Sequence, residues 1–75
     1  MNDERRKEIA KAMTLLQDAV NIIEAVKDEE QDSFDNMPES FQQGDKGSQM
    51  EEGIQALESA VDSIQSAEGD LDNLQ

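Results

Sequence analysis

Apolar residues in the first half of the chain recur at alternating spacings of three and four. Such a repeat is the stripe of an amphipathic helix, and no glycine or proline interrupts it over residues 3–32. Other apolar residues lie beside the stripe and make it wider than a two-stranded coiled-coil seam, which indicates more than one packing neighbour. Asn2 or Asp3 can cap the start of this helix. The members of the stripe are Ile9, Ala12, Leu16, Ala19, Ile23 and Val26, flanked by Met13, Leu15, Val20 and Ile22.

The last third of the chain carries a stricter repeat. Residues 54–74 read IQALESA, VDSIQSA, EGDLDNL, and the first and fourth positions of each seven are mostly apolar, as in a coiled coil. Met50 extends this series backwards. Ser48 followed by Glu51 has the spacing of a capping box. The pattern predicts a second helix over residues 48–74.

Two places in these helices carry residues that a helix pair does not favour. Asp28, Glu29 and Glu30 lie near the C-terminal end of the first helix, where the helix dipole favours cations. Glu68 takes a first position of the heptad, and Gly69 follows it. We expect the last turns of the second helix to fray, and the acidic run to serve a use or to meet the basic end of a partner chain.

The stretch QDSFDNMPESFQQGDKG (residues 31–47), which contains the connector between the helices, holds both phenylalanines, the only proline and two of the four glycines. Asn36 and Pro38 have the spacing of a cap followed by a first helical turn. They predict a short helix over residues 37–43 that ends at Gly44, followed by a turn through Gly47. The phenylalanines either fasten this connector to the hairpin or form a surface that grips a partner, and one role does not exclude the other.

The order long helix, connector (residues 33–47), long helix predicts one all-α domain over residues 1–75, an antiparallel helical hairpin with a short connecting helix. Two helices alone cannot bury so wide a stripe, so we expect a two-fold homodimer that forms a four-helix bundle. The residues expected in the core or the dimer contact are Ile9, Leu16, Val20, Ile23, Val26, Met50, Ile54, Leu57, Val61, Ile64 and Leu71.

Charge is divided unevenly along the chain, which has six basic and nineteen acidic residues and a net charge of −13. Residues 1–27 are neutral, whereas residues 28–75 hold one lysine and fourteen carboxylates. This field repels nucleic acid and anionic membranes and attracts basic proteins. Direct nucleic-acid binding is therefore not expected. No segment has the ~20 apolar residues that cross a bilayer, and a cytoplasmic protein is expected.

Cysteine and histidine are both absent, which removes thiolate chemistry, the usual general base near neutral pH and the commonest metal ligand. No nucleophile elbow or phosphate-binding loop is present either, so no enzyme and no cofactor are expected. Asp28, Asp32 and Asp35 share a helix face and could hold a hard cation. They are more simply explained as a solvated charge run, and no metal site is predicted.

A non-catalytic interaction protein remains. Its carboxylates could imitate duplex phosphates and block a basic, nucleic-acid-handling protein, or they could only keep the chain soluble. The heptad could seat a helix of another protein, or serve the hairpin and the dimer alone, as a structural or assembly accessory would need. The partner-binding candidates are Asp28, Glu29, Glu30, Asp32, Phe34, Asp35, Met37, Glu39 and Phe41.

Residues 28–64 also resemble a family of small acidic helical proteins of phages, prophages and bacteria. Its signature is close to DEEQ-x-x-F-D-N-M-P-E-x-x-Q, then a glycine-containing turn and a Met-Glu-Glu helix. The matching positions are Asp28–Gln31, Phe34–Glu39, Gln42 and Met50–Glu52, whereas Phe41 stands where leucine is more usual. The resemblance implies a phage-related protein in a bacterial cell and, by analogy with other small acidic phage proteins, an inhibitor of a host enzyme or defence system. It implies no established biochemical activity.

Overall fold

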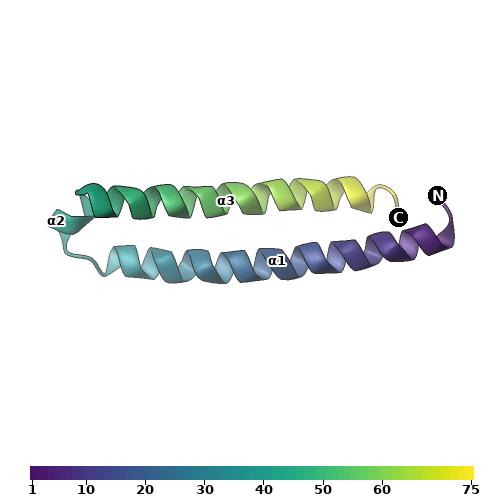
Figure 1. The fold of residues 1–75 in the computed structure, drawn as a ribbon, viewed down its shortest axis with the longest axis horizontal. Helices are drawn as coiled ribbons and strands as arrows, with labels where there is room; N and C mark the ends of the chain where they lie inside the picture. The colour runs from purple at the N-terminus through teal and green to yellow at the C-terminus, as the bar shows by residue number, and fades with distance from the viewer.

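The computed structural model describes residues 1–75 and contains three helices, α1 (Asp3–Asp35), α2 (Glu39–Gln42) and α3 (Asp45–Asp72). The long helices α1 and α3 run antiparallel, α2 lies at the closed tip, and both chain termini lie at the open end (Figure 1). The all-α hairpin with a short connecting helix is therefore confirmed.

The hairpin is a single layer of helices. Its Cα atoms extend over 58 × 15 × 12 Å, which leaves no room for a third element above or below the helix pair. Only four of 75 residues are buried, and the buried side chains with apolar character are Val20, Ile54 and Val61. These three lie on the line where α1 and α3 meet, called the seam below. All other apolar residues keep part of their surface in water.

The seam follows one edge of the wide stripe on α1. Val20 is buried at its centre, and Ile9, Leu16 and Ile23 are partly buried beside it. Beyond Ile23 the partly buried positions are Lys27, Glu30 and Phe34, at spacings of four and three. Val26 is six residues from Val20, which is not a whole number of 3.6-residue turns, so it points to a different side of α1.

Val26 is accordingly 47% exposed and lies outside the hairpin seam. Phe34, in contrast, is partly buried and adds one more turn of α1 to the seam. The helix therefore ends at Asp35, not at residue 32, despite the unfavourable acids in its last turns.

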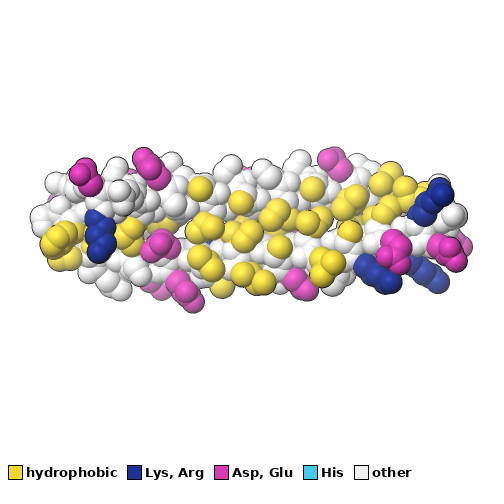
Figure 2. All heavy atoms as spheres, viewed as in Figure 1, with side chains coloured by type: hydrophobic (Ala, Val, Ile, Leu, Met, Phe, Trp, Pro, Cys, Tyr) yellow, Lys and Arg dark blue, Asp and Glu magenta, His cyan; other side chains and the backbone are white.

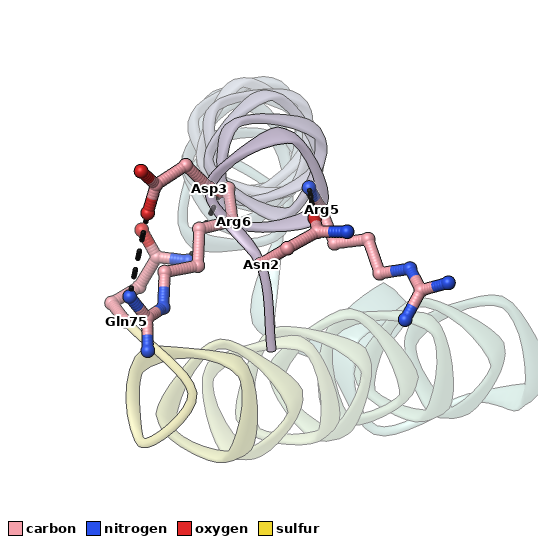
Figure 3. Close-up of polar contacts among 5 residues, drawn as sticks. All are labelled: Asn2, Asp3, Arg5, Arg6 and Gln75. Carbon is pink, nitrogen blue, oxygen red and sulfur yellow. Dashed lines mark hydrogen bonds and ion pairs between the residues drawn. The ribbon is translucent and has the colours of Figure 1, made fainter.

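Residues near the two termini form hydrogen bonds and an ion pair at the open end of the hairpin. The Asn2 side chain accepts a hydrogen bond from the Arg5 amide at 2.8 Å, which confirms the predicted cap. The Gln75 side chain donates to the Arg6 carbonyl at 3.2 Å, and Arg6 also pairs with Asp3 at 3.6 Å. Figure 3 shows Gln75 beside Arg6, whereas the Arg5 guanidinium points away on the other side of α1.

The tip differs from the prediction in its boundaries. Asn36 caps the C-terminus of α1 and does not start the short helix, which begins after Pro38. Helix α3 begins at Asp45 with Gly44 as its N-cap. The predicted capping box of Ser48 is wrong, because Ser48 lies inside the first turn.

Gly47 explains this early start. It is buried in the first turn of α3 and has no left-handed backbone, so it does not serve as a turn glycine. A Cβ atom at this position would lie 2.6 Å from the Phe41 carbonyl oxygen and closer still to that of Gln42. The missing side chain therefore lets α3 pack directly against the end of α2.

We predict that Gly47→Ala destabilises the fold by about 2–4 kcal/mol, because backbone atoms must move to admit the methyl group. The melting temperature, followed by far-UV circular dichroism, should fall by roughly 4–8 °C per kcal/mol. Gly53→Ala is the matched control, since a Cβ there meets open space and alanine favours a helix by roughly 0.5–1 kcal/mol. An unchanged melting temperature in Gly47→Ala would contradict the close packing.

Glu68 occupies the seam position where the heptad expects an apolar residue. Its side chain is partly buried, and its Oε1 atom is buried without a hydrogen-bond partner. Leaving such an atom unpaired costs free energy. Helix α3 nevertheless continues past it to Asp72.

Glu68→Leu should stabilise the hairpin by about 1–2 kcal/mol, because it removes the unpaired oxygen and completes the apolar seam. Thermal unfolding at fixed chain concentration measures the change. Glu52→Leu makes the same change in charge and side chain at an exposed position of α3 and should alter stability by no more than about 0.5 kcal/mol. Equal effects of the two substitutions would show that Glu68 acts only through net charge.

Candidate interaction surfaces

One broad side of the hairpin is apolar. On α1, Leu15, Ile22 and Val26 are 69%, 65% and 47% exposed, and their spacings of seven and four place them on one side of the helix. Figure 2 shows a band of hydrophobic side chains along the junction of the two helices and separate hydrophobic patches on the adjoining side of α1. From α3 the partly buried Leu57, Ala60, Ile64 and Ala67 border the seam. These seven residues are called the apolar face.

The opposite side is acidic. Glu24, Asp28, Gln31 and Asp35 recur at spacings of four and three on α1, and Glu51, Gln55, Glu58 and Asp62 do so on α3. Gln31 lines the same hollow of about 250 Å³ as Glu51, Gln55 and Glu58, so the two rows lie on one side of the hairpin. Counted from buried Val20 at about 100° per residue, this row and the Leu15 row leave α1 in opposite directions. The carboxylates Glu24, Asp28, Asp35, Glu51, Glu58 and Asp62 are called the acidic face.

The five predicted charge contacts of residues 28–35 do not form one surface. Asp28, Asp32 and Asp35 are exposed and share the acidic side of α1. Glu29 is exposed next to that row, while Glu30 is partly buried near the seam. No group of three acidic side chains lies close enough to hold a metal ion.

No ion pair forms within residues 28–75, the acidic half of the chain. The ion pairs are Arg6 with Asp3 and Lys11 with Glu8, both at exposed positions in the first turns of α1. None of the fourteen carboxylates of residues 28–75 pairs with a cation. Their field therefore reaches solvent unneutralised and falls off only by dielectric and ionic screening.

The aromatic candidates at the tip are separated by the fold. Phe34 is partly buried and borders the hollow on the acidic side. Phe41 is 56% exposed. With Met37, Pro38 and Met50 it lines a mostly apolar hollow of about 410 Å³, whose remaining residues are Ser33 and Lys46. Phe34 thus packs against the hairpin, as expected of a residue that fastens the connector, whereas Phe41 stays more than half exposed. Glu39 is exposed in the first turn of α2.

Gln42 holds the tip in place, a role that the sequence patterns did not reveal. Its Nε2 atom donates to the Phe34 carbonyl at 2.8 Å and to the Met37 carbonyl at 3.2 Å. These bonds satisfy carbonyl groups at and just beyond the end of α1 and tie α2 to that helix. Spacing alone gives no sign of this, because a glutamine in a short polar segment usually faces water.

Gln42→Glu should loosen the tip, because a carboxylate cannot donate to the two carbonyl oxygens and repels them. We expect a loss of about 1–3 kcal/mol in stability and faster hydrogen exchange of the amides of residues 36–44. Gln43→Glu is the control, since the Gln43 side chain is exposed and bonds only to the Glu39 carboxylate. Equal exchange rates in the two variants would show that the Gln42 bonds do not order the tip.

Comparison with known proteins gives no relative. No family model, no curated protein and no solved structure matches the chain. No helix is both long and apolar enough to cross a membrane.

Proposed function

We propose that the chain is a non-catalytic, acidic interaction protein that binds a basic surface of another protein and modulates or inhibits it. The observation that carries the proposal is the acidic face, a two-helix surface of carboxylates with no cation of the same chain paired to it. The complementary partner is a protein whose basic residues are grouped, and nucleic-acid-handling proteins carry such groups.

The proposed setting is the cytoplasm of a bacterial host cell, and the proposed partner belongs to the host or to a phage. Support for a phage-related protein comes from the signature resemblance over residues 28–64. The proposed working form is a homodimer in a four-helix bundle, which would present two acidic faces and hold a partner more tightly than one face can. Phe41 and the hollow beside it would add an apolar contact at the tip.

A second candidate is a structural or assembly accessory that acts only through helical self-association. The apolar face favours it, because such an exposed band indicates an interaction site. The two candidates differ in the surface that a partner needs. An inhibitor needs the acidic face, whereas an accessory needs only the apolar one.

The test is a pull-down with the tagged protein from nuclease-treated bacterial lysate, eluted with a salt gradient and identified by mass spectrometry. We expect a basic, nucleic-acid-handling protein to elute by roughly 0.3 M salt, where the Debye length is about 6 Å. Return of the protein's own copy alone would favour the accessory. A host partner that stays bound at high salt would contradict a charge-based contact.

Two variants of equal net charge locate the contact. The first neutralises four carboxylates of the acidic face, and the second neutralises four exposed carboxylates elsewhere. Only the first should weaken partner binding, by about tenfold or more. Equal losses would mean that net charge and not the acidic face attracts the partner. The first variant is Asp28→Asn, Asp35→Asn, Glu58→Gln, Asp62→Asn; the second is Asp18→Asn, Glu29→Gln, Glu52→Gln, Asp70→Asn.

A further inference from the structure

The apolar face has no partner within the chain. Leu15 and Ile22 are exposed by about two thirds, more than any other large apolar residue of the protein. Between Lys11 and Glu29 this row of α1 carries one charged side chain, Asp18, which lies three residues after Leu15 and four before Ile22. On the α3 side the face includes two small residues, Ala60 and Ala67, which would let another helix approach closely.

The hairpin exposes more surface to solvent than a compact monomer of the same mass would. The hairpin exposes 5463 Å², whereas a compact monomer of 8.3 kDa exposes roughly 4,600 Å². The excess of about 900 Å² is close to the ~800 Å² that each partner buries in a standard protein interface. A single further hairpin laid on the apolar face supplies that area.

We infer that a second copy of this chain packs on the apolar face, with the tips of the two hairpins at opposite ends of the bundle. The inference rests on the homodimer of the proposed function and adds its face and its direction. In a two-fold dimer the same surface of both copies forms the contact, so an apolar face that is complementary to itself suits this symmetry.

Charge determines the direction. The open end carries both signs of charge (Figure 2). Arg5 and Lys7 there have no ion-pair partner, and the acids at this end are Asp3, Glu4, Glu8, Glu68, Asp70 and Asp72. Asp28, Glu29, Glu30, Asp32 and Asp35 lie at the other end of α1. Tips at the same end would bring two of these acidic clusters together, which is repulsive. Tips at opposite ends keep the two clusters at opposite ends of the bundle, each at the same end as the first turns of the other copy, where four basic residues outnumber Asp3, Glu4 and Glu8.

The first test is the mass of the protein by sedimentation equilibrium. We expect twice 8.3 kDa for the natural chain and about a hundredfold weaker dimer for Ile22→Lys, which places a charge in the contact twice. Asn21→Lys is the matched control, because it makes an exposed lysine one residue away on the polar side of α1 and should leave the dimer intact. A monomeric natural chain, or equal effects of the two substitutions, would overturn the inference.

Ile22→Lys could also unfold a hairpin that is stable only as a dimer, so helicity is followed in the same samples. Concentration-dependent melting of the natural chain then still reports the dimer, since mass action couples folding to association. A melting temperature independent of concentration would count against it. These measurements use the protein alone, so their failure leaves partner binding through the acidic face untouched.

A spin label tests the direction. The chain has no cysteine, so Ser40→Cys in α2 provides a unique label at the tip. Tips at opposite ends should give a label-to-label distance near the 58 Å length of the hairpin. A short distance in an intact dimer would overturn the proposed direction.

Discussion

The packing of α1 against α3 in a single layer is the constraint on which the rest of the structure depends. Two helices side by side can cover each other along one line only, and here that line buries Val20, Ile54 and Val61. The apolar stripe of α1 is wider than this line. Its outer part therefore stays in water, and the hairpin has an apolar side for the same reason that its core is small.

The tip decides how the two helices meet. Gly47 allows the first turn of α3 to pack against the end of α2, and Gln42 ties α2 to the end of α1 through two carbonyl groups. These contacts set the start of α3 relative to the end of α1, and hence which residues face each other along the seam. Phe41 is left exposed by the same arrangement.

The proposed dimer contact and the acidic face lie on different sides of the hairpin. An interface on the apolar face would leave both acidic faces of a dimer in solvent, so self-association and partner binding need not compete. The polarity of charge along α1, with basic first turns and an acidic last third, has a different effect. In the proposed dimer it makes one direction of pairing less repulsive than the other, which hydrophobic contact alone would not do.

The sequence by itself determined the two long helices, the short helix between them and the cap at Asn2, because each depends on neighbours within a few residues. It also determined the imbalance of charge, which is a matter of composition alone. Tertiary structure decided the rest. Which edge of the wide stripe forms the seam depends on where α3 lies, and this leaves Val26 exposed while Lys27 and Phe34 are partly covered. The start of α3 at Asp45, and the requirement for glycine at position 47, follow from a backbone contact between two segments. No local pattern records that contact, because it exists only after the chain has turned back on itself.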